Sequence, residues 1–183
     1  CVGDPERRFR EDALRILRDD LARKVRPAFI ATGAMSDPYN PFEVSLQLTR
    51  HALELIDAYQ CGAAIATKSD LIVRDRDILD SIARHSPVIC KLTITTTDDA
   101  LAARLEPGAP SPSRRLAALR ELADRGLFAG VLLMPVLPFL EDTEENVLEV
   151  VERAAEAGAS FVYPALGVTM REGQREYFLQ GLE

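Results

Sequence analysis

The chain has 183 residues, of which 47% are hydrophobic and 28% charged, and it carries a formal net charge of -7. This length suits a single domain over residues 1–183 with a full hydrophobic core, and no apolar run approaches the roughly 20 residues of a membrane-spanning helix. The acidic balance argues against a broad nucleic-acid-binding surface and leaves open only a local phosphate contact, for which Arg114 and Arg115 are the candidates.

Predicted helices and strands alternate along the chain. The first helix begins at Asp4-Pro5, a capping residue followed by a proline at the first helical position, and it continues to about Lys24. An apolar strand follows at 29–31. Apolar spacing predicts further strands at 63–67, 88–95, 128–135 and 161–166, and further helices at about 46–59, 75–84, 113–125, 143–157 and 174–182.

Strands that are separated by helices of this length pair in parallel through right-handed crossovers. Five such strands form either an open doubly wound sheet or part of a barrel. The sequence has no GxGxxG motif after the first strand and no GxxxxGK[ST] motif anywhere. Neither nucleotide-binding motif therefore supports the open sheet. We therefore predict an α/β fold of the TIM-like barrel type, with parallel strands and with its first strand upstream of Cys1.

The carboxyl ends of parallel strands meet at one rim, where ligands bind. Residues 33–37, 67–69, 95–98 and 135 are expected there. Gly33 would let a ligand approach the backbone, and Ser36 offers a hydroxyl. Asp37 either faces a ligand or closes an Asx turn. Lys68 follows an apolar strand and either binds a carboxylate or hydroxyl or extends into solvent.

Other polar residues near the rim are less distinctive. Thr95 or Thr97 is a candidate ligand-binding residue, although threonines also alternate in ordinary strands. Arg115 lies in the first turn of a helix, where the helix dipole opposes positive charge, so an anionic partner is expected nearby; Glu106 could be that partner. Four carboxylates could form a divalent-metal site, although their spacing is nonspecific: Asp37, Glu43, Asp98 and Asp99.

The three cysteines, Cys1, Cys61 and Cys90, lie far apart and lack the spacing of a metal site or redox pair. We expect Cys61 and Cys90 to behave as small buried residues. Without a disulfide framework, the chain is expected in the reducing cytoplasm.

Several segments occur together in an order that is typical of one family. They are GAMSDPYNPFE, LTRHALELI, TKSDLIVRDRDIL, ITTTDDALAARLEPGAPSPSRRLAALRELADRG and VLLMPVLPFLEDTEENV. From about Phe29 to Val168 the chain resembles radical S-adenosylmethionine (SAM) proteins of the spore photoproduct lyase-like branch. The resemblance implies a partial (βα)6 barrel, of which this chain would cover about strands two to six.

The resemblance also implies a SAM-binding site. The segment Gly33, Ala34, Met35, Ser36, with Asp37 after it, matches the glycine-rich segment that holds the amino group of the methionine moiety. Lys68, Thr95 and Arg115 match positions that bind the ribose and the methionine carboxylate, and Pro135 and Val136 would lie near the adenine. No catalytic residue and no metal ligand in this chain is assigned.

One departure from the family pattern concerns the 4Fe-4S cluster. The CxxxCxxC motif that supplies its three thiolates is absent from this sequence and is expected upstream, because Cys61 and Cys90 belong to other parts of the fold. With that motif the protein would be a radical SAM enzyme with a lyase-like or oxidoreductase-like activity.

In such an enzyme the reduced cluster cleaves SAM to a 5'-deoxyadenosyl radical that acts on an unidentified substrate, and a flavodoxin or ferredoxin would donate the electron. Two alternatives stay open. One is a cluster-less barrel that binds a small anionic metabolite, and the other is a carboxylate-metal hydrolase that uses Asp37 and Asp98.

Overall fold

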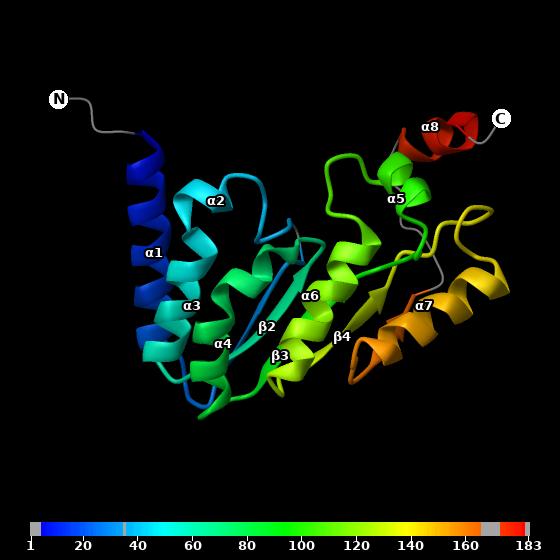
Figure 1. The fold of residues 1–183 in the computed structure, drawn as a ribbon. Helices are drawn as coiled ribbons and strands as arrows, with labels where there is room; N and C mark the ends of the chain where they lie inside the picture. The colour runs from blue at the N-terminus through cyan, green and yellow to red at the C-terminus, as the bar shows by residue number, and fades with distance from the viewer. Residues whose placement is uncertain (1–4, 35, 166–172, 182–183) are drawn as a thin grey trace.

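Five parallel strands form one sheet in the order β1-β2-β3-β4-β5 (Figure 1). The computed structural model describes residues 5–34, 36–165 and 173–181. The strands are β1 (Phe29–Thr32), β2 (Gly62–Thr67), β3 (Val88–Thr93), β4 (Phe128–Leu133) and β5 (Val162–Pro164).

Helices connect every pair of neighbouring strands, and one further helix precedes β1 and another follows β5. They are α1 (Pro5–Arg23), α2 (Glu43–Leu46), α3 (Leu48–Ala58), α4 (Arg76–Ala83), α5 (Asp99–Leu105), α6 (Pro112–Asp124), α7 (Glu144–Glu156) and α8 (Gln174–Gly181), with the 3-10 helix η1 at Asp70–Asp75. Within the described ranges no helix is both long enough and apolar enough to cross a membrane.

The strand order decides between the two predicted architectures. Each crossover adds the next strand at the same edge of the sheet. Because these crossovers are right-handed, all the connecting helices then lie on one face of the sheet. Figure 1 shows α3, α4, α6 and α7 in front of the strands. A doubly wound sheet would instead reverse direction and carry helices on both faces. The predicted parallel sheet of a partial barrel is therefore confirmed.

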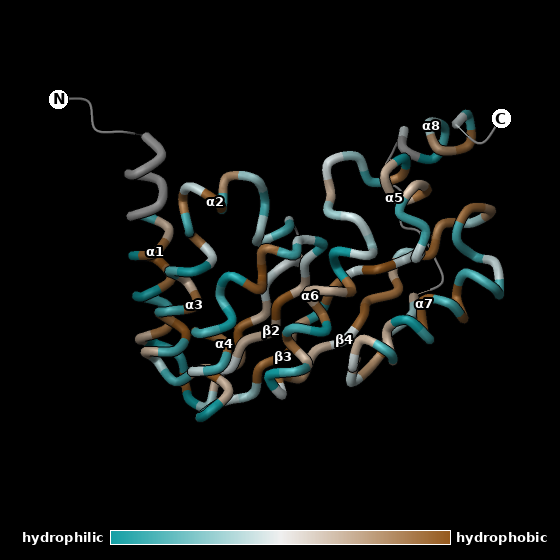
Figure 2. Tube along the Cα trace, viewed as in Figure 1, coloured by the Kyte–Doolittle hydropathy of each residue, from teal (hydrophilic) through white to brown (hydrophobic). Residues whose placement is uncertain are grey.

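The hydrophobic core lies between the sheet and these helices (Figure 2). Because side chains alternate along a strand, Cys90 and Leu92 of β3 enter this core and are fully buried. Ile89 and Lys91 of the same strand point to the opposite face and are only partly buried. One face of the sheet is thus covered by helices, and the other carries the side chains that β3 turns away from the core.

The structure differs from the predicted elements mainly near the rim. β3 and β4 end at Thr93 and Leu133, two residues earlier than expected. Pro135 lacks a backbone N–H, so it cannot donate a hydrogen bond to extend the ladder of β4. The prediction omitted α2, η1 and α5, which are short elements between the strands and the long helices. The cap Asp4 and residue 166, which ends the last predicted strand, lie outside the described residues.

Candidate functional site

A pocket of about 410 Å³ lies at the carboxyl ends of β1, β2 and β3. Six residues that the sequence places at the rim line it together: Gly33, Ala34, Ser36, Asp37, Thr67 and Lys68. Residues from β2, β3 and the end of β4 complete it: Ala66, Thr93, Leu132 and Met134. We call this the rim pocket. Met35, the remaining member of the predicted glycine-rich segment, lies outside the described residues.

Gly33 is required by the path of the chain at this rim. Its φ is +90°, a conformation that side chains rarely adopt, and a Cβ at this position would lie 2.1 Å from the carbonyl oxygen of Ala66. The loop after β1 therefore crosses directly against β2. Any larger residue would push the loop away and open the rim pocket.

Asp37 ties that loop to the end of β2. Its Oδ1 accepts hydrogen bonds from the Tyr39 N–H at 2.9 Å and the Thr67 hydroxyl at 2.6 Å. Its Oδ2 accepts the Lys68 N–H at 2.7 Å. The bond to Tyr39 confirms the Asx-turn interpretation. Because both oxygens already accept hydrogen bonds, Asp37 shapes the rim pocket through its neighbours.

Glu106 connects Lys68 with Arg115 beside the pocket. The Lys68 ammonium donates to one carboxylate oxygen of Glu106, and the Arg115 guanidinium donates to the other at 2.6 Å. Burial acts to raise the pKa of Glu106, but the hydrogen bonds from Lys68 and Arg115 outweigh it and hold the pKa below its usual range. One carboxylate is thus shared by two cations.

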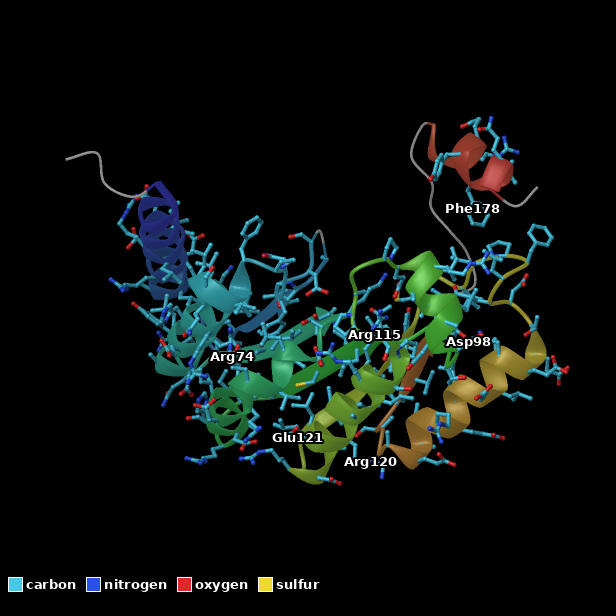
Figure 3. The ribbon with its side chains drawn as sticks, turned by 45° about the horizontal axis from the view of Figure 1, so that its top comes forward. Arg74, Asp98, Arg115, Arg120, Glu121 and Phe178 are labelled. Carbon is cyan, nitrogen blue, oxygen red and sulfur yellow. The ribbon has the colours of Figure 1, made fainter. Side chains whose placement is uncertain are left out.

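Arg115 has Glu106 as its anionic partner in this structure, which is the internal alternative that the sequence left open. Arg115 is buried, and its other two guanidinium nitrogens donate to the carbonyl oxygens of Pro110 and Thr93. Figure 3 shows it among the side chains at the start of α6, with Arg120 and Glu121 further along the helix. The loop that carries Glu106 folds back over this helix start, which spacing alone does not reveal.

Thr95 also turns inward. Its hydroxyl donates to Oε1 of Glu141 at 2.6 Å, and Leu137 N–H donates to the other oxygen at 3.1 Å. Glu141 is buried, and burial raises its pKa, an effect that the hydrogen bond from Thr95 offsets in part. Asn146 donates to the carbonyls of Thr95 and Glu141. This network joins the ends of β3 and β4. The sequence-based prediction did not include Glu141, whose signal is a glutamate within the apolar stretch after β4.

The remaining predicted residues do not line the rim pocket. Pro135 is exposed and Val136 is buried in the core. Arg114, the other candidate for a phosphate contact, pairs instead with Asp70 at 2.6 Å. Both arginines therefore have carboxylate partners in this structure.

The predicted carboxylate metal site is also not assembled. Asp98 caps α5 by accepting the N–H groups of Ala100 and Leu101 (Figure 3), and Glu43 pairs with Arg74 at 2.8 Å. Within the described residues, no three His, Cys, Asp or Glu side chains gather as a metal site would require. The sequence-based metal hypothesis was wrong because each carboxylate is used by a neighbouring helix or turn.

Cys61 and Cys90 are both buried, as expected. Burial raises the pKa of the Cys90 thiol to about 12, with the charge of Asp80 adding to the effect. A thiol of this kind neither ionises near neutral pH nor reaches the rim. These two cysteines do not fit the ligand set of an iron–sulfur cluster.

A larger cavity of about 610 Å³ continues from the rim pocket along the sheet face that the helices leave uncovered. The two share Gly33, Ala34, Ala66, Leu132 and Met134. A ligand at the rim would thus lie directly beside a second, more apolar space.

Known proteins resemble this chain in sequence and in fold. No family model matches the chain. An uncharacterized protein of Mycobacterium tuberculosis is 30% identical over 165 residues, which are 90% of this chain and 48% of that protein. One of Methanocaldococcus jannaschii is 35% identical over 128 residues, 70% of this chain and 48% of that protein. The chain spans about half the length of these curated relatives.

Two solved structures share the fold. Spore photoproduct lyase complexed with dinucleoside spore photoproduct superposes with a TM-score of 0.68 at 16% identity, covering 93% of this chain and 50% of that one. Streptococcus suis SuiB bound to S-adenosylmethionine gives a TM-score of 0.61 at 18% identity, covering 94% and 39%. The chain therefore has the α/β fold of these two proteins.

Proposed function

We propose that this chain is the SAM-binding part of a radical SAM enzyme. The observation that carries the proposal is the rim pocket at the strand ends, which lies on the fold of SuiB bound to S-adenosylmethionine and opens into a second cavity. The family-like segments of the sequence support the same assignment. Bound SAM, with a reduced 4Fe-4S cluster, would supply the radical chemistry of that class.

The donors around the rim pocket fit the amino-acid part of SAM. Glu106 carries one negative charge against the two positive charges of Lys68 and Arg115, so the group favours a further carboxylate. Lys68 is the member that lines the pocket, and its side chain is 39% exposed. The Ser36 hydroxyl and the loop carbonyls can accept hydrogen bonds from an ammonium. Lys68 and Ser36 would hold the methionine moiety, with Arg115 fixing Glu106 behind them.

The described cysteines do not fit the cluster, so we place its ligands outside the described residues. Anaerobic reconstitution of this chain with iron and sulfide should leave it without a cluster. A protein that extends the chain to the length of its relatives should bind about four irons and show thiolate-to-iron charge-transfer absorbance. Failure of the longer protein to take up iron would favour the cluster-less metabolite-binding barrel. An electron donor such as a flavodoxin or ferredoxin belongs to the same proposal.

The SAM site is tested by calorimetric titration of the chain and of Lys68→Met. Losing a charge-assisted contact should weaken SAM binding about ten- to a hundredfold. Methylthioadenosine has no carboxylate, so its affinity should not change. Lys24→Met is the matched control, because Lys24 is an exposed lysine that directly follows α1 and does not line the rim pocket. If SAM does not bind, or if Lys68→Met weakens both ligands equally, the assignment is wrong.

A further inference from the structure

The larger cavity lies on the sheet face opposite the helices. Ala66 of β2, Ile89 and Lys91 of β3 and Leu132 of β4 all line it. Its volume of about 610 Å³ falls within the range of about 300 to 1,000 Å³ that is typical of small-molecule sites. The cavity is therefore large enough for a ligand in addition to whatever occupies the rim pocket.

Among the residues that the structure describes, Lys91 is the only charged one that lines this cavity. It is partly buried, and no described residue forms a hydrogen bond or ion pair with its ammonium. The other two lysines differ: Lys68 pairs with Glu106, and Lys24 lies exposed beyond the end of α1. A cation in a largely apolar cavity, without a carboxylate partner among the described residues, favours a negatively charged ligand group.

Aromatic rings stand beside Lys91 on the same face. Lys91 pairs in register with Gly130 of β4, so both positions face the cavity. A Cβ on Gly130 would lie 2.6 Å from the ring of Phe161, which shows that this ring rests on the glycine. Phe161 stacks with Phe128 at a centroid distance of 5.3 Å and an interplanar angle of 28°. Both rings line the cavity together with Tyr163.

We propose that this cavity binds the substrate, that Lys91 pairs with a carboxylate on it, and that the rings contact a planar, unsaturated body. One ammonium matches a singly charged carboxylate, whereas a phosphate dianion would leave one negative charge without a cation among the described lining residues. The substrate role rests on the proposed function, because SAM in the rim pocket would border this space. The binding preference itself depends only on the cavity.

The test uses three probes with the same ring system: 2-naphthoate, neutral 2-naphthamide and 2-naphthyl phosphate. By calorimetry the chain should bind naphthoate about ten- to a hundredfold more tightly than naphthamide. Lys91→Met should abolish this difference, and Lys24→Met should preserve it. Ala31→Trp, at an exposed position that lines this cavity and not the rim pocket, should weaken both probes.

The proposal is overturned if Lys91→Met leaves the preference intact, or if Ala31→Trp affects neither probe. Tighter binding of naphthyl phosphate than of naphthoate would overturn the carboxylate assignment. SAM titration of Lys91→Met separates this proposal from the preceding one, since Lys91 does not line the rim pocket and SAM affinity should be unchanged. Loss of SAM binding in the unmodified chain would refute the proposed function alone, because the naphthoate result does not depend on it.

Discussion

Replacing Arg115 by methionine should destabilise the fold, while the same change at Arg114 should not. Methionine keeps most of the side-chain volume, so the comparison isolates the lost polar contacts. The Arg115 side chain is 2% exposed and donates to Glu106, Pro110 and Thr93 at 2.6, 2.7 and 2.9 Å. Its removal leaves Glu106 with one cation instead of two and leaves two carbonyls without this donor.

Breaking a buried ion pair costs about 3 to 5 kcal/mol, because the remaining charge stays desolvated. For a domain of this size each kcal/mol lowers the melting temperature by about 2 to 4 °C, so Arg115→Met should melt about 6 to 20 °C lower. The Arg114 side chain is 66% exposed, and its pair with Asp70 is a surface salt bridge worth about 0 to 1 kcal/mol. Arg114→Met should therefore shift the melting temperature by no more than about 4 °C.

Thermal denaturation followed by circular dichroism at pH 7 measures both variants, and urea unfolding gives the free energies. A double variant, Arg115→Met with Glu106→Gln, should lose less than the sum of the single changes, because the two side chains share one interaction. Equal melting temperatures for the two arginine variants would refute this account. So would a loss of SAM affinity in Arg115→Met at unchanged stability, which would make Arg115 a direct ligand contact.

Three further predictions concern the same rim. Gly33→Ala should lower the melting temperature and weaken SAM binding, because its Cβ would meet the carbonyl of Ala66; unchanged melting in a thermal scan would contradict the crossing of β2. Asp37→Ala removes an acceptor of three hydrogen bonds and should cost about 1 to 3 kcal/mol in urea unfolding, more than it costs ligand binding after correction for stability. The lowered pKa of Glu106 means that its ionisation stabilises the fold above about pH 4.3, and that this stabilisation disappears as the pH falls through the folded-state pKa. The difference in melting temperature between the unmodified chain and Glu106→Gln should therefore be full at pH 7 and shrink below about pH 4, which a calorimetric pH series would show.

The sequence was sufficient to predict the parallel sheet and the location of the rim. Apolar periodicity and caps such as Ser111 before Pro112 are local signals, and the structure places α6 where they predict it. Because the carboxyl ends of parallel strands share one edge, the same pattern correctly grouped Gly33, Ser36 and Lys68. The position of α6 follows from residues that are neighbours in the sequence. The grouping at the rim follows from the general rule that strands joined by helical crossovers run parallel.

The partners of the polar side chains were decided by tertiary structure alone. Glu106 lies 38 residues from Lys68 and 9 from Arg115, and it meets both only because its loop folds back over the start of α6. Lys91 alternates along β3 like its neighbours, and its place in a cavity follows from which sheet face the helices cover. Strand and helix periods specify the direction of a side chain relative to its own element, whereas the groups it meets depend on the packing of distant segments.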